Sequence, residues 1–284
     1  MSQISFTHQL QTILDSLFIL PRRLVLCTPG VDPTVPMLRG VWGKALHDLN
    51  EMVYKRVFNQ GDEGGTPLYV LRPGGFEAGG FPVVEHILLG EAIRHEGVLL
   101  AAWIRACESG LGPDRVPFFL RGYALEPDGN RAPTDAPWPL GQAHWPLAGD
   151  PATTACELSF PWPVRLLSQG RLISEPTLPD LVVSLCRRVE GFLATDQIAP
   201  WRELSRYCLG LAREIPSSAW EGGPCDLVRW SARQQAEVQL RGVTGSLYLH
   251  EGPGPLWPLL AAGGWLHIGK GTVMGLGRVF VNPG

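Results

Sequence analysis

The chain has 284 residues, of which 45% are hydrophobic and 18% are charged, and this is enough for two domains of ordinary size. It has no apolar run of about 18 residues, so a membrane-spanning helix is excluded. The net charge of −3 argues against a strongly basic nucleic-acid-binding protein.

The charge is unevenly distributed along the chain. Residues 20–60 carry six Lys and Arg against three Asp and Glu, and residues 201–284 carry eight against six. Residues 61–200 carry 10 against 17, so the middle of the chain is acidic. A basic face is therefore compatible with an acidic protein if the two ends meet in space.

The six cysteines are widely spaced and include no C-x-x-C pair. This favours reduced thiols over a zinc site or a disulfide framework. The first residues also lack the basic and apolar regions of a secretion signal. We therefore expect a cytoplasmic protein with no metal and no cofactor.

Hydrophobic periodicity predicts a strand, a helix, two strands, a helix and a strand in the first part of the chain. Their expected ranges are 18–27, 37–58, 68–72, 81–89, 91–108 and 116–125. This order of elements is typical of a ferredoxin-like unit. Residues 126–153 are rich in proline, glycine and aspartate and are predicted to form a linker or long loop.

The second part repeats the same order. It is predicted to contain a strand, a helix, an irregular stretch, a strand pair, a short helix, a strand and a closing strand, at 156–167, 178–193, 196–224, 229–249, 256–262, 265–268 and 276–281. We therefore expect an α+β fold of two tandem ferredoxin-like (βαββαβ, RRM-like) units side by side. The expected units are 1–125 and 154–284.

The segment 263–278, GGWLHIGKGTVMGLGR, contains six glycines. Gly264, Gly269 and Lys270 have most of the spacing of a phosphate-binding loop, but Gly271 stands where that motif needs Ser or Thr. Too little chain follows for the further strands of a nucleotide-binding fold. Glycine permits the close approach of another backbone, so the segment raises the question of which backbone approaches.

Four segments of the chain are informative when taken together, namely MLRGVWGKALHDL (37–49), GLGPDRVPF (110–118), VRWSARQQAEVQLRGVTGSLYL (228–249) and LLAAGGWLHIGKGTVMGLGRVFV (259–281). In this order they resemble the CRISPR pre-crRNA-processing endoribonucleases of the repeat-associated mysterious protein (RAMP) superfamily. Residues 126–153 and 196–224 match poorly. The resemblance implies a cleft between two ferredoxin-like units, with the glycine-rich loop holding CRISPR repeat RNA.

The resemblance also implies cleavage without a metal ion. The ribose 2′-OH attacks the adjacent phosphate and leaves a cyclic phosphate and a 5′-OH. Such a reaction needs a base, a cation for the developing charge and an acid. His47 is the candidate for the base or the acid, because helical geometry turns it away from the apolar stripe that contains Ala45 and Leu49. Lys44 and Tyr54 lie on the same face, and His267 is the second candidate.

The expected RNA contacts combine backbone amides of the loop with basic side chains. They are Arg39, Arg229, Arg233, His267, Gly269, Lys270, Gly271, Thr272 and Arg278. The expected partner is a repeat hairpin, with other CRISPR effector subunits as further partners and no small-molecule ligand. Two alternatives stay open, namely a non-catalytic RNA-binding RAMP subunit and an ordinary two-domain enzyme or scaffold whose glycine turn binds nothing.

Overall fold

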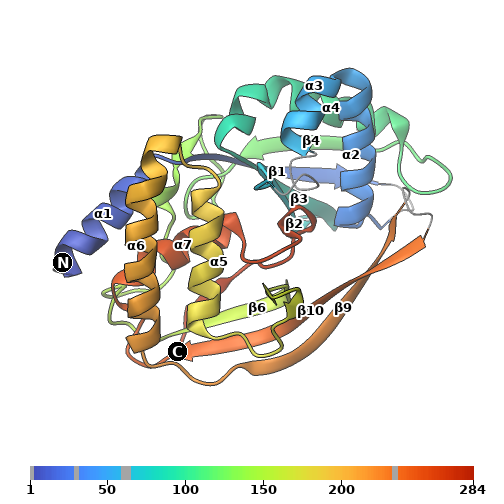
Figure 1. Cartoon of the computed structure of the whole chain (residues 1–284). Coiled ribbons are helices and arrows are strands. Elements are labelled where there is room, and N and C mark those ends of the chain that lie inside the picture. The colour runs from blue at the N-terminus through green and yellow to red at the C-terminus, as the bar shows by residue number, and fades with distance from the viewer. Residues whose placement is uncertain (1–2, 29–31, 59–64, 232–235) are drawn as a thin grey trace. The chain divides into compact units, whose positions relative to one another are not determined.

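The computed structural model describes residues 3–28, 32–58, 65–231 and 236–284. Two compact units are present (Figure 1). The N-terminal unit contains Phe18–Trp138 and Val273–Gly275, and the C-terminal unit contains Met1–Leu17, Pro139–Thr272 and Leu276–Gly284. The first helix, α1 (Gln3–Asp15), is thus grouped with the C-terminal unit. The domain bounds 1–125, 126–153 and 154–284 stay a prediction.

The N-terminal unit has the ferredoxin-like order of elements. The main ones are β1 (Phe18–Cys27), α2 (Val35–Leu49), β2 (Tyr69–Glu77), β3 (Phe81–Leu89), α4 (Glu96–Ser109) and β4 (Phe119–Ala124). The sheet order is β2-β3-β1-β4, and all of these neighbours are antiparallel. Helices α2 and α4 pack against each other on one face of the sheet, where Trp42 stacks on Trp103 at 5.5 Å above His86 of β3.

The helix predicted over 37–58 is broken at Asn50. This residue has an extended backbone, and its side chain accepts a hydrogen bond from the amide of Val53 at 3.0 Å. A second, short helix therefore begins there, α3 (Glu51–Val53), and continues as the π-helical turn η1 (Tyr54–Phe58). The predicted apolar stripe was wrong at Leu49, which is exposed because the break turns this end of the segment outward, and Met52 beyond the break is exposed too.

The C-terminal unit repeats the pattern, with α1 and one further helix added to it. Its main elements are β6 (Cys156–Val164), α5 (Leu178–Glu190), α6 (Thr195–Glu214), β9 (Glu221–Ser231), β10 (Ala236–Leu249), α7 (Trp257–Leu266) and β11 (Phe280–Pro283). The sheet order, β11-β6-β10-β9, is equivalent to that of the first sheet. The predicted tandem ferredoxin-like fold is confirmed.

Helix α6 replaces most of the stretch that we predicted to be irregular. Its buried residues, Trp201, Leu204, Cys208 and Ala212, have helical spacing, and α6 packs against α5. The internal Pro200 and Gly210 concealed this pattern because both residues disfavour helix interiors.

The strand predicted at 265–268 was also wrong, because α7 extends to Leu266. This helix is buried nearly all round, so its sequence has no periodicity that distinguishes a helix from a strand.

The shorter elements lie mainly in the connections. They are η2 (Gly90–His95), β5 (Trp138–Pro139), η3 (Leu140–Gln142), β7 (Leu167–Ser168), β8 (Arg171–Leu172), η4 (Gly254–Leu256) and η5 (Thr272–Met274). Among the described residues, no helix has both the length and the apolar character needed to cross a membrane.

Candidate functional site

Three of the predicted catalytic residues come together at the end of α2. His47 lies one turn beyond Lys44 on this helix, and half of its side chain is exposed. The break at Asn50 brings the ring of Tyr54 to 5.1 Å from the His47 ring, in an edge-to-face arrangement. The sequence placed Tyr54 on the same helical face, whereas in the structure it is the change of helix axis that produces the contact.

Asp48 joins these residues, although the sequence analysis did not single it out. Its carboxylate lies 2.7 Å from the Lys44 ammonium and 3.4 Å from Nδ1 of His47. The hydrogen bond from Lys44, followed by that from His47, lowers the pKa of Asp48. The i, i+4 spacing of Lys44 and Asp48 was a signal for this pair.

The arrangement has the chemical groups of a general base and its support. A carboxylate beside Nδ1 favours the tautomer with the proton on that nitrogen, which leaves Nε2 free to accept a proton. The ammonium of Lys44 and the phenol of Tyr54 supply N–H and O–H donors to the same face. We call Lys44, His47, Asp48 and Tyr54 the histidine cluster.

A stack of aromatic rings connects the histidine cluster to Arg39. Tyr54 stacks on Phe58 at 4.9 Å, and Phe58 stacks on Tyr69 of β2 at 5.7 Å. The guanidinium of Arg39 lies 4.1 Å from the centre of the Phe58 ring, and its Nε donates to the Tyr69 hydroxyl at 2.9 Å. Arg39 is therefore fixed by π contact and hydrogen bonding, with part of its side chain still exposed.

The glycine-rich segment 263–278 is approached by the protein's own backbone. The amide of Lys270 donates to the carbonyl of Arg165 at 2.8 Å, and that of Gly277 donates to Pro163 at 2.9 Å. Gly269 and Gly277 have φ values of +85° and +76°, and a Cβ atom at either position would overlap a carbonyl group. These glycines are thus required by the fold itself, and RNA contact along this segment stays a prediction.

The other predicted contacts of the segment differ in accessibility. Lys270 is exposed, while Thr272 is buried. Arg278 is half-buried, with its guanidinium 4.4 Å from the centre of the Phe280 ring. The His267 ring has no exposed surface, and its Nδ1 lies 2.8 Å from the Leu276 carbonyl oxygen. In this conformation His267 cannot touch RNA.

Two of the predicted arginine contacts lie outside what can be described. Arg233 belongs to the residues that the structure leaves undescribed, as does the side chain of Arg229, although the backbone of Arg229 pairs with Val238 between β9 and β10. Within the described ranges, no three His, Cys, Asp or Glu side chains form a group that could hold a metal ion.

Comparison with known proteins identifies the fold. Residues 158–279 match the family model described as CRISPR-associated endoribonuclease Cas6. A Cas6 product complex is 21% identical, with 93% of this chain and 99% of that chain covered and a TM-score of 0.56. A Thermus thermophilus Cas6 is 14% identical, with 93% and 98% covered and a TM-score of 0.57. No curated protein matches the chain in sequence.

One similar structure belongs to a larger assembly. It is described as a partial Cas6-RT-Cas1–Cas2 complex and is 14% identical, with a TM-score of 0.53. The match covers 95% of this chain and 47% of that chain. The resemblance inferred from the four sequence segments is thus confirmed by the family model and by the fold.

Proposed function

We propose that the protein cuts CRISPR repeat RNA to produce guide RNA, because residues 158–279 match the Cas6 endoribonuclease family model and the chain has the fold of Cas6 structures. The observation that supports a catalytic role is the histidine cluster, in which an exposed imidazole lies beside a carboxylate, an ammonium and a phenol. A protein that only holds RNA has no need of such a group.

His47 is proposed as the base. Its Nε2 takes the proton of the ribose 2′-OH, the O2′–P bond forms, and the P–O5′ bond breaks. The proton held on Nε2 then returns by way of water to the departing O5′, so the products are the 2′,3′-cyclic phosphate and a 5′-OH, and His47 is neutral again. Asp48 acts as a positioning residue, because its carboxylate orients the ring through Nδ1. We propose that none of these steps uses a metal ion.

Cationic and hydrogen-bonding groups near the base offset the charge of the transition state. Lys44 supplies the ammonium of the histidine cluster, and Tyr54 supplies its hydroxyl. Arg39 lies at the far end of the aromatic stack, where we propose that it binds a neighbouring phosphate.

The RNA substrate is proposed to be a repeat hairpin. Two similar structures are described as Cas6 product complexes, which supports RNA as the ligand of this fold. Lys270, Arg278 and the amide of Gly271 remain the proposed contacts of the glycine-rich segment, together with Arg229 and Arg233 of the strand pair. The amide of Gly269 is not among them because it donates to Ser184 Oγ at 2.8 Å, and Thr272 is buried.

A second candidate function is a non-catalytic RNA-binding subunit. The similar chain from the Cas6-RT-Cas1–Cas2 complex supports other CRISPR proteins as partners. The two functions differ only in whether the histidine cluster transfers protons.

Cleavage of a labelled repeat RNA from the host's own array, measured in EDTA, tests the proposal. We expect the wild type to cut once and His47→Ala to bind the RNA but cut it about 10²- to 10⁴-fold more slowly. His144→Ala is the matched control, because His144 is exposed and lies outside the cluster. Undiminished cutting by His47→Ala would exclude His47 as the base. Binding without cutting by the wild type would favour the second function.

A further inference from the structure

The face of the N-terminal sheet opposite α2 and α4 has a row of polar side chains across all four strands. His86 points toward α2 and α4, so its neighbour Glu85 points to the opposite face. Glu85 is in register with Arg72 of β2 and with Arg23 of β1, and Arg23 is in register with Tyr123 of β4. Residues in register share a face, so these four side chains form one row.

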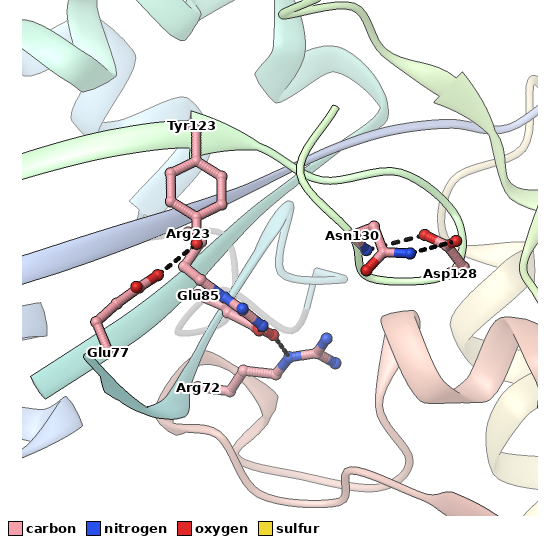
Figure 2. A network of polar contacts seen from close by, with 7 residues as sticks. All are labelled: Arg23, Arg72, Glu77, Glu85, Tyr123, Asp128 and Asn130. Carbon is pink, nitrogen blue, oxygen red and sulfur yellow. Dashed lines mark hydrogen bonds and ion pairs between the residues drawn. The ribbon is translucent and has the colours of Figure 1, made fainter. Parts of the chain in front are cut away.

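Ion pairs and hydrogen bonds fix this row, as Figure 2 shows. Glu85 binds Arg72 at 2.6 Å and Arg23 at 2.7 Å, and the Tyr123 hydroxyl donates to Glu77 at 2.6 Å. Arg72 and Glu85 are buried, whereas Tyr123 is only half-buried. The row therefore holds Tyr123 at the accessible edge of the face.

Two exposed phenylalanines lie at one end of the same face. Phe119 is four residues before Tyr123 on β4, and Phe81 is four residues before Glu85 on β3, so both share the face of the polar row. They are exposed to 72% and 40%. Strand β1 separates them, which sets their backbones about 10 Å apart. Large apolar side chains in this position have no role in the core.

Arginines surround the exposed rings. Arg121 lies between Phe119 and Tyr123 on β4 and is exposed, and the guanidinium of Arg131 is 5.0 Å from the centre of the Tyr123 ring. With Arg23 and Arg72 these make four cations, against the three carboxylates of Glu77, Glu85 and Asp128, the last of which accepts a hydrogen bond from Asn130 (Figure 2). Arg72 and Glu85 are buried as an ion pair, whereas Arg121 and Arg131 are exposed beside the rings. These residues thus carry a net charge of +1, although the whole chain carries −3.

We propose that Phe81, Phe119 and Tyr123, with Arg121 and Arg131, form a stacking surface for a single-stranded part of the RNA. Aromatic rings bind unpaired bases by stacking, and arginines bind the phosphates between them. The positive charge favours a nucleic acid over an apolar protein segment as the occupant. The proposal deepens the proposed function, on which it rests, by assigning a separate surface to the unpaired nucleotides beside the hairpin.

Binding of two RNAs to the full chain tests the stacking surface. One RNA is the repeat hairpin alone, and the other has single-stranded extensions on both sides with 2-aminopurine in each extension. We expect the extensions to raise the affinity of the wild type and to have their fluorescence quenched by stacking. Phe119→Ala and Phe81→Ala are each expected to lose about tenfold in affinity for the extended RNA only.

The control variants separate stacking from other effects. Phe119→Leu keeps an apolar side chain and is expected to behave like Phe119→Ala, because it has no aromatic face. Ile104→Ala removes a similarly exposed side chain from α4 and is expected to leave both affinities unchanged. Thermal unfolding confirms that the variants are folded.

Unchanged affinity and unchanged quenching in Phe81→Ala and Phe119→Ala would overturn the proposal. This is also the result expected if a protein partner, and not RNA, covers the surface. The cleavage assay on the hairpin alone is independent of these residues. Loss of extension binding in a chain that does not cut would support the stacking surface while the proposed function fails. If the chain cuts the hairpin normally and the phenylalanine variants bind the extended RNA like the wild type, the proposed function stands and the stacking surface fails.

Discussion

Gly43 of α2 determines how closely the aromatic rings of the candidate site pack. A Cβ atom at this position would overlap the ring of Phe58, which stacks on Tyr54 and lies under the guanidinium of Arg39. The missing side chain therefore lets the aromatic stack lie against the helix that carries His47. Gly40, on the same helix, has open space at the equivalent position.

Gly43→Ala is expected to lower the free energy of unfolding by about 1–3 kcal/mol, because the Phe58 ring must move. Cleavage is expected to slow by about tenfold or more, since Tyr54 moves with that ring. Gly40→Ala is the control and is expected to raise stability by up to about 1 kcal/mol with unchanged cleavage. Urea unfolding and single-turnover kinetics measure both effects. Equal behaviour of the two variants would show that the stack does not position the site.

His86 makes the N-terminal core sensitive to acid. Burial, with a smaller contribution from Arg22, lowers the pKa of this histidine from 6.5 to about 3. The folded protein thus binds a proton here less readily than the unfolded chain. The contribution of neutral His86 to the free energy of unfolding is fully present above pH 6.5. It is lost as the pH falls from 6.5 toward 3, at about 1.4 kcal/mol per pH unit.

His86→Gln removes this titration while keeping an acceptor for Trp103, whose Nε1 lies 3.2 Å from Nδ1 of His86. Between pH 7 and pH 5 the wild type is expected to lose about 2 kcal/mol more unfolding free energy than the variant. Denaturant unfolding at the two pH values gives this difference directly. The comparison between the two proteins cancels the carboxylates that titrate in both. Parallel pH dependences would contradict the assignment.

At the scale of elements, the segments that the sequence predicted poorly are those in which local signals conflict. One periodic stripe suggested a single helix over 37–58, but the side chain of Asn50 competes for the backbone and begins a new helix. Helix α6 was missed because Pro200 and Gly210 lie inside it, and packing against α5 outweighs their low propensity. The strands of the N-terminal sheet were predicted near their observed places, because each contains a short apolar run. In the C-terminal sheet, β9 begins at Glu221, inside the stretch predicted to be irregular, and the closing strand predicted at 276–281 begins only at Phe280.

Gly277→Ala is expected to destabilise the C-terminal unit by at least about 2 kcal/mol more than Gly170→Ala. Both glycines have positive φ, but only a Cβ atom at Gly277 would overlap a carbonyl, that of Ile268. The shared backbone strain therefore cancels in the comparison. Thermal unfolding of both variants measures the difference. If the two lose equal stability, the close approach to Ile268 is not what requires glycine.

At the scale of the whole molecule, the segments near the two ends of the chain are each grouped with the unit that is more distant in sequence. Helix α1 begins the chain but is grouped with the C-terminal unit, where Phe6 is fully buried and its ring lies 4.8 Å from that of Tyr207 on α6. Residues Val273–Gly275, near the other end, are grouped with the N-terminal unit. Each unit is therefore completed by a segment that is distant in sequence.

Phe6→Ala is expected to lower the free energy of unfolding by about 3–5 kcal/mol, because it leaves a cavity beside α6. Amide hydrogen exchange is expected to quicken in α6 more than in α2. His8→Ala, an exposed position on the same helix, is the control and is expected to change neither quantity. Equal acceleration in α2 would contradict the grouping of α1 with the C-terminal unit.

The sequence by itself determined the two ferredoxin-like units, the glycine-rich segment, and His47 with Lys44 and Tyr54 as candidates. Alternation, helical spacing and glycine placement are local properties, so they can be read along the chain. Only the tertiary structure decided that His267 is buried and that the protein's own backbone fills the glycine turns. The row containing Arg23 and Glu85 also depends on the tertiary structure. Contacts between residues on separate strands depend on the strand register, which no single segment encodes.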